Sequence, residues 1–245
     1  MFLIKNTKKY LKGYIDLKYP NWDITIALRY LPIIDDLKKN YKPEDKILEV
    51  GSEITGITNY FPVEVTGLDV AFDYSKKNEY LKPVKGSATQ IPFEDKSFDF
   101  VLSVDMLEHI PDDLREKVIQ EMIRVCRKKL YLSFPCGKKS EEVDQRLHQY
   151  FLKKRGQDYQ YLKEHVSLGL PNYNHVKSIL KSTKGFKLTI KNNTNIKLWE
   201  ILLKLGLSGE KFKSSLYRRL LIALPLLKYF NFSPTYRKLF ILERI

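Results

Sequence analysis

Residues 86–111, GSATQIPFEDKSFDFVLSVDMLEHIP, decide how this 245-residue chain folds. Within them an apolar run, 98–104, follows a polar turn and ends in polar residues. Two earlier runs, 46–50 (KILEV) and 65–68 (VTGL), end in the same way. Short apolar runs of this kind indicate buried strands of a parallel α/β sheet, and ligands bind at the edge where such strands end.

Two carboxylates mark that edge. Asp69 lies 20 residues after Glu49, the spacing at which an acidic residue contacts a ribose diol in a nucleoside site. A nicotinamide-dependent oxidoreductase would also need G-x-G-x-x-G after the first strand, and GSEITG at 51–56 does not match that pattern. The spacing therefore predicts a nucleoside site of another kind.

Four short motifs connect the chain to a known family. They are Gly86-Ser87-Ala88, Ile91-Pro92-Phe93, SFDFV at 97–101 and Leu107-Glu108-His109. In this combination they resemble the class I S-adenosylmethionine-dependent methyltransferases, specifically type 11-like methyltransferase domains similar to those in cell-surface glycan gene sets. A looser likeness continues to about Lys191.

The resemblance implies an α/β fold with a doubly wound, mostly parallel seven-stranded sheet, Rossmann-like, and a helical insertion between strands six and seven. The whole chain, 1–245, is expected to be one methyltransferase domain. Its expected parts are an N-terminal helical segment (1–44), a cofactor-binding core (45–192) with a lid (138–170), a basic amphipathic helical insertion (193–235) and a final strand (236–245).

The same resemblance implies S-adenosyl-L-methionine as the cofactor and assigns residues to it. Asp69 is expected to accept the ribose hydroxyls, with Val70 on the adenine face. The other expected cofactor-binding residues are Glu49, Gly51 and Ser52 at the methionyl end, Ser87 and Ala88 at the adenine, and Ser103 and Val104 at the end of the fourth strand.

The first loop departs from the family pattern. Glu53 and Thr55 stand where the family has glycines, and Ser87 stands where it has an aspartate. Glycines there let backbone amides approach the cofactor. We predict that Glu53 points away from the cofactor carboxylate, which leaves the amides of Gly51 and Ser52 to approach it. A non-catalytic scaffold with the same fold is the alternative.

The implied reaction is direct transfer of the methyl group to a small-molecule, glycan or lipid-linked acceptor, with a hydroxyl as the acceptor group. Removing its proton requires a base, for which Asp105, His109 and His165 are the candidates. Glu108 and His109 could instead only wall the pocket, and His148 and His165 could be exposed polar residues of the lid. The sequence shows no metal-ligand spacing, so a metal-free reaction is expected.

Charge is concentrated at one end of the chain. Residues 181–245 hold 14 Lys and Arg against three acids, which gives +11 of the total of +14. Basic amphipathic helices suit an anionic membrane surface, although they could equally be a solvated lobe. Two cysteines without metal or disulfide spacing and the lack of a signal peptide favour a cytoplasmic enzyme. Its basic end is expected to make it peripheral at the inner membrane surface. Because residues 1–180 carry only +3, specific nucleic-acid binding is not expected.

Overall fold

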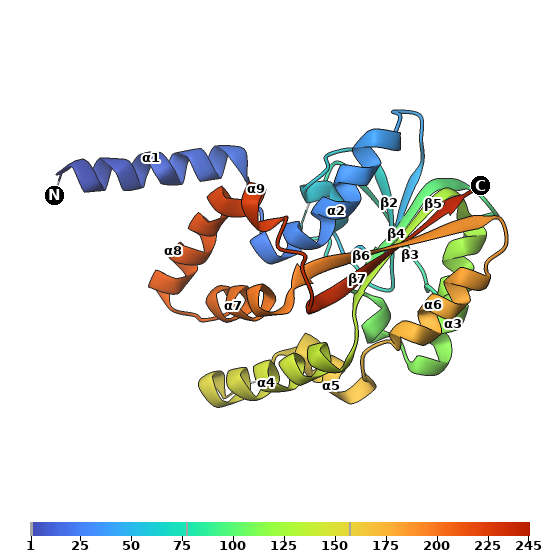
Figure 1. Cartoon of the computed structure of the whole chain (residues 1–245). Helices are drawn as coiled ribbons and strands as arrows, with labels where there is room; N and C mark the ends of the chain where they lie inside the picture. Colours follow the sequence, from blue (N-terminus) through green and yellow to red (C-terminus); the bar gives the residue numbers. More distant parts are fainter. Residues whose placement is uncertain (1, 77, 157) are drawn as a thin grey trace.

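A computed structural model describes residues 2–76, 78–156 and 158–245, with side chains from Tyr10 onward. Its centre is one seven-stranded sheet in the order β3-β2-β1-β4-β5-β7-β6, with helices on both faces (Figure 1). Only β7 runs antiparallel to its two neighbours, which confirms the predicted doubly wound, mostly parallel sheet. The strands are β1 (Ile47–Val50), β2 (Val65–Asp69), β3 (Leu81–Lys85), β4 (Phe98–Val104), β5 (Cys126–Pro135), β6 (Phe186–Asn195) and β7 (Thr235–Arg244).

Helices account for most of the remaining chain. None of the helices described is long and apolar enough to cross a bilayer. The α-helices are α1 (Phe2–Lys18), α2 (Ile24–Asn40), α3 (Asp112–Val125), α4 (Lys138–Arg155), α5 (Gln160–Leu168), α6 (Tyr173–Ser182), α7 (Ile196–Gly206), α8 (Lys211–Arg219) and α9 (Leu224–Leu227). Three short 3-10 helices are η1 (Gly56–Asn59), η2 (Leu107–His109) and η3 (Leu220–Ala223).

The alternation of side chains along the central strands builds two hydrophobic cores. In β1, Ile47 packs with residues of α2, whereas Leu48 packs with residues of α3 and α6 on the other face. Successive residues of a strand point to opposite faces, so a strand covered on both sides is apolar throughout. This is why 46–50 and 98–104 are mostly apolar, although each also carries buried polar residues, Glu49 in the first and Asp99 and Ser103 in the second.

A third core joins the lid to the insertion. Phe151 of α4 and Leu162 of α5 cluster with Trp199 and Leu203 of α7 and with Tyr236 of β7. The indole of Trp199 is only 4% exposed. The first helix of the insertion is therefore packed against the sheet edge and the lid, while α8 has no buried residue.

The sixth strand is longer than predicted. It continues past Lys191 to Asn195, so the segment between β6 and β7 covers 196–234. The polar run at 192–195 looks like a loop, but its backbone pairs with β7. The Asn195 side chain also accepts hydrogen bonds from the amides of Lys197 and Leu198 and thereby caps α7.

Candidate functional site

A pocket of about 210 Å³ lies where β1 and β4 end. The loop after β1 and residues of α2 form one side, and the lid helix α5 lies opposite. Trp199 of α7 and Arg237 of β7 complete the wall. The sheet edge, the lid and the insertion thus enclose one common space, at the position where open parallel sheets bind ligands.

The loop after β1 depends on a buried acid. Glu49 accepts hydrogen bonds from the hydroxyl of Tyr30 (2.7 Å) and from the amide of Ile57 (2.7 Å). Burial raises the pKa of Glu49 to about 7. Gly51 lines the pocket with φ +78°, and a Cβ there would collide with the side chain of Met106. Glu49 itself does not line the pocket, and it supports the loop through its hydrogen bond with the amide of Ile57.

The residue that replaces the family glycine is held by the lid. Glu53 adopts φ +45°, and its Oε1 accepts a hydrogen bond from the hydroxyl of Tyr161 at 3.0 Å. Its backbone amide donates to Asp69 Oδ2 at 2.9 Å. Glu53 therefore connects the lid to Asp69 at the end of β2, and its orientation relative to a cofactor carboxylate stays a prediction.

The predicted nucleoside residues lie beside the pocket rather than in it. Asp69 ends β2, and its carbonyl accepts from the amide of Gly86 after β3 at 2.9 Å. Val70 is 65% exposed, and the Ser87 hydroxyl is bonded to Thr89. These residues and Ala88 form an open edge. Of the remaining predicted cofactor residues, Ser52 and Val104 line the pocket and Ser103 is fully buried.

Asp105 is held by two arginines. It adopts φ +52°, and its carboxylate accepts from Arg237 Nε at 2.6 and 2.8 Å and pairs with Arg29 Nη1 at 3.0 Å. Burial alone would raise the pKa of Asp105, but the two guanidinium groups outweigh burial and keep the pKa below its usual value. A carboxylate stabilised in this way is a weak base. These contacts weigh against Asp105 as the base, and they hold Arg29 and Arg237 beside the pocket; the assignment of the base stays a prediction.

The two predicted histidines lie next to each other with their ring centroids 5.0 Å apart. His109 Nδ1 is 2.7 Å from Glu164 Oε2, and His165 Nδ1 is 2.9 Å from Asp144 Oδ2. Each carboxylate accepts a hydrogen bond from an Nδ1–H, which leaves Nε2 as the basic nitrogen of the ring. His165 is not an exposed lid residue, because it lines the pocket.

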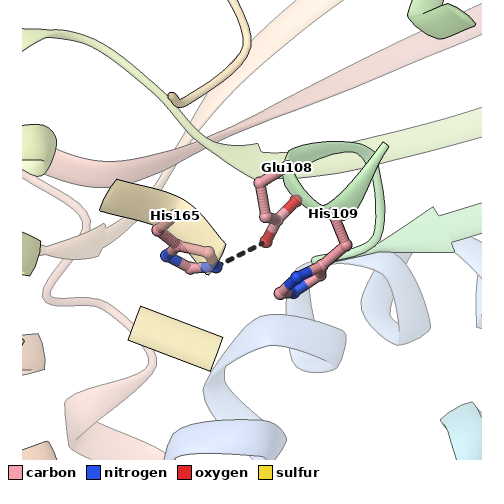
Figure 2. A group of neighbouring side chains, drawn as sticks. All are labelled: Glu108, His109 and His165. Atoms are coloured by element: carbon pink, nitrogen blue, oxygen red, sulfur yellow. Dashed lines mark ion pairs between the residues drawn. The ribbon is translucent and has the colours of Figure 1, made fainter. Parts of the chain in front are cut away.

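Glu108 lies between the histidines and the arginines. It is fully buried, its Oε1 is 3.8 Å from His165 Nε2, and neither oxygen has a hydrogen-bond partner among the residues that the structure describes (Figure 2). Burial raises the pKa of Glu108 well above its usual value, and the neighbouring Asp105 carboxylate raises it further. The sequence shows no metal-ligand spacing, yet the fold brings Glu108, His109 and His165 together at one point.

Sequence reasoning missed three wall residues. The guanidinium of Arg237 lies 4.2 Å from the centre of the Trp199 ring, which stacks on Tyr236. Both terminal nitrogens of Arg237 are buried and have no hydrogen-bond partner in the described ranges of the chain. Arg29 approaches from α2. Arg29, Trp199 and Arg237 come from three distant parts of the chain, and Arg237 sits in a run that reads simply as a strand, so no local signal identifies them.

Comparison with known proteins gives the site a context. Residues 48–134 match the family model described as "Methyltransferase domain". The norajmaline N-methyltransferase of Rauvolfia serpentina is 29% identical over 113 residues, which cover 40% of this chain and 37% of that protein. The chain spans well under half the length of the first curated relatives that it matches.

Two solved structures share the fold. The phosphoethanolamine N-methyltransferase 2 of Haemonchus contortus, in complex with S-adenosyl-L-methionine, aligns with a TM-score of 0.53 at 17% identity over 96% of this chain and 60% of that one. A methyltransferase bound to the Trm112 activator of Haloferax volcanii aligns with a TM-score of 0.52 at 12% identity, over 88% and 90% of the two chains.

Proposed function

Since the chain belongs to the class I S-adenosylmethionine-dependent methyltransferases, we propose that it methylates a hydroxyl of a small-molecule, glycan or lipid-linked acceptor. The observation that carries this proposal is the single pocket shared by Gly51 of the first loop and the basic side chains of His109 and His165. A methyl donor at the loop and a hydroxyl at the histidines would meet inside it. Holding the methyl donor and the acceptor close together and in line is the main contribution that a protein makes to a displacement reaction.

The residues at the sheet edge fit S-adenosylmethionine, which supplies a methyl group already activated on a sulfonium. Asp69 would accept the ribose hydroxyls, because its carboxylate lies at the end of β2 beside the exposed Val70. Ser87 and Ala88 would meet the adenine. Gly51 and Ser52 would offer amides to the methionyl end, with Glu49 holding their loop and with Ser103 and Val104 closing the β4 side.

His165 is the best-placed base for the acceptor proton. Asp144 holds its Nδ1–H, so Nε2 is free to accept a proton in the pocket. The lid carries His165 and also Tyr161, which bonds to Glu53 of the first loop. Contact between lid and loop would exclude water from the site, which strengthens every electrostatic interaction inside it.

Calorimetry followed by a transfer assay tests this function. We expect the chain to bind S-adenosylmethionine and to release S-adenosylhomocysteine when it is given hydroxyl acceptors, sugars and polyprenyl-linked sugars among them. Cofactor binding without transfer to any acceptor would favour the non-catalytic scaffold. Transfer to amines in preference to hydroxyls would contradict the choice of acceptor group, which the N-methyltransferase names of the relatives make a necessary control.

The lobe formed by α8, η3 and α9 supports an acceptor at an anionic membrane surface. Phe212 of α8 and Leu226 of α9 are 79% and 69% exposed, and Tyr229, in the turn after α9, is 72% exposed. Basic residues accompany them on α8, and such residues contribute about 1 kcal/mol each near an anionic surface. The basic side chains of α8 are Lys211, Lys213, Arg218 and Arg219.

Vesicle co-sedimentation tests the membrane contact. We expect binding to anionic but not neutral lipid, reduced by salt and by Arg218→Glu with Arg219→Glu. Because Arg218 pairs with Asp16 of α1, the melting temperature of the variant must be measured beside its binding. Lys181→Glu with Lys184→Glu, at the end of α6, is the matched control with the same change of charge. Equal loss of vesicle binding in the two double variants would contradict a membrane-binding surface localised to α8.

A further inference from the structure

We propose that Glu108, His109 and His165 bind a divalent transition-metal ion, such as Zn²⁺, on the acceptor side of the pocket. One ligand atom from each residue can be chosen so that all lie within 4.8 Å of one another. Figure 2 shows the three side chains converging from η2 and from the lid helix α5. Two imidazoles and one carboxylate are a ligand set of catalytic zinc sites, in which a fourth position remains open.

The contacts behind the histidines are those that metal-binding histidines need. His109 Nδ1 is bonded to Glu164, and His165 Nδ1 is bonded to Asp144. A carboxylate on Nδ1 fixes the ring and makes Nε2 a better ligand. Asp144 is itself held by the hydroxyl of Tyr236 at 2.7 Å. Both rings are therefore oriented in advance, although neither histidine is close to the other in sequence.

Glu108 is the independent observation that points to a ligand. It is 0% exposed, and both of its carboxyl oxygens lack a partner within the described part of the chain. A buried polar group without a partner costs about 1–3 kcal/mol, and more when it is charged. The nearest histidine nitrogen, Nε2 of His165, is 3.8 Å away, which is too far for a hydrogen bond but leaves room for an ion between them.

The charges around the cluster suit a divalent cation. Four carboxylates against two guanidinium groups leave a net charge of −2 when all are ionised and the histidines are neutral. Both guanidinium groups are directed at Asp105, so their charge is partly compensated there. The four carboxylates are Asp105, Glu108, Asp144 and Glu164, and the guanidinium groups are those of Arg29 and Arg237.

This inference rests on the proposed methyl transfer and gives the acceptor site its chemistry. The open position of the ion would face the pocket and take the oxygen of the acceptor hydroxyl, whose acidity rises on a metal ion. The O–H bond breaks, the proton passes to water at the pocket mouth, and the electron pair stays on the oxygen. His109 and His165 then act as ligands, and the ion takes over from His165 the activation of the acceptor.

Titration of Co²⁺ into the chelator-treated, untagged full chain tests the site, because Co²⁺ reports its ligands by visible absorption. We expect saturation at one ion per chain with a dissociation constant in the micromolar range or below, and displacement of Co²⁺ by Zn²⁺, as expected for imidazole ligands. Glu108→Gln should weaken binding at least about tenfold, because an amide is a poorer ligand. Gln has the shape of the neutral acid, so the fold should be retained.

Three further variants define the outcome. His109→Ala is the second ligand variant, should Glu108→Gln fail to fold. Asp144→Asn, which keeps the size of a positioning residue, should weaken the metal by about 10–100-fold. His148→Ala removes a lid histidine that contacts Asp158 instead of the cluster and should leave metal affinity unchanged. Absence of Co²⁺ binding, or equal affinity in all of these proteins, would overturn the proposal.

Cofactor calorimetry on the same samples separates this proposal from the proposed function. Metal binding without S-adenosylmethionine binding would support the site and contradict the methyltransferase activity. Full methyl transfer in chelator-treated protein that binds no metal would support the methyltransferase activity and contradict the metal site.

Discussion

Two neighbouring regions of the sheet edge are built in different ways. The expected nucleoside edge, made of Asp69, Val70, Ser87 and Ala88, is open, and its residues lie at or just after the ends of β2 and β3. The transfer pocket around Glu108 and His165 is enclosed by the lid and by α7. One region takes its residues from two adjacent strand ends, whereas the other collects them from the loop after β1 and from α2, η1, β4, η2, α5, α7 and β7.

The difference teaches which part of the site is free to vary. Asp69 is placed by the end of β2 and by one hydrogen bond from the amide of Glu53, so the expected nucleoside edge depends on the sheet and on the loop after β1. The transfer pocket exists only because the lid and the insertion fold onto the same edge and share the core around Trp199. Loops and insertions of this kind carry specificity on a rigid scaffold. We therefore expect changes in the two regions to separate cofactor binding from methyl transfer.

The largest effect is expected in the transfer pocket. His165→Ala should lower the rate of methyl transfer by about 100-fold or more, because it removes either a general base or a metal ligand. The affinity for S-adenosylmethionine, measured by calorimetry, should change by less than about threefold, which is under 1 kcal/mol. His148→Ala, elsewhere on the lid, is the control. A loss of cofactor affinity equal to the loss of rate would remove the distinction between the two regions.

The converse result is expected at the nucleoside edge. Asp69→Ala should weaken cofactor binding by at least about tenfold, because hydrogen bonds to a charged carboxylate contribute roughly 1.5–3 kcal/mol each. Since Asp69 also accepts from the amide of Glu53, the melting temperature should be compared with that of Asp69→Asn, which retains an acceptor. Unchanged cofactor affinity in Asp69→Ala would contradict its assignment to the ribose.

The loop that joins the two regions should respond to pH through Glu49. Its folded-state pKa of about 7 lies above the ordinary value of 4.5. The stability that follows from this difference is fully present below about pH 4.5 and is lost as the pH rises through 7, at about 1.4 kcal/mol per unit of pKa shift at most.

Glu49→Gln removes that titration while keeping an acceptor for the amide of Ile57. The free energy of unfolding, measured in urea, should therefore fall more between pH 5 and pH 8 for the wild type than for the variant. Parallel pH profiles of the two proteins would show that Glu49 titrates normally.

The smallest effect is expected at Glu53. Glu53→Gly removes the hydrogen bond from Tyr161, which destabilises the loop, and relieves the strain of the positive φ angle, which stabilises it. The two effects oppose each other. Cofactor affinity should change by less than about tenfold, or about 1.4 kcal/mol. A large gain in affinity would instead mean that Glu53 obstructs the nucleoside edge, and the non-catalytic scaffold would become the better description.

Much of the fold could be predicted because it is encoded locally. Buried strands such as 98–104 are mostly apolar on both faces, so they are visible in the sequence, and the motif from Ser97 to Val101 points to one family. Polar residues at strand ends located the edge of the sheet where the pocket lies, and the nucleoside residues assigned there remain a prediction. The end of β6 could not be predicted, because Asn193 and Asn195 are paired by the distant β7 rather than by any local preference.

The sequence by itself determined the sheet, the cofactor class and the residue types available for chemistry, because these depend on hydrophobic periodicity and on short motifs. Only the tertiary structure decided what those residues do. Asp105 became the partner of Arg29 and Arg237, which lowers its pKa and makes it a weaker base. Glu108, His109 and His165 became one cluster because the lid folds over the strand ends. Ion pairing and desolvation act through space, so residues far apart in the chain set the chemistry of the site.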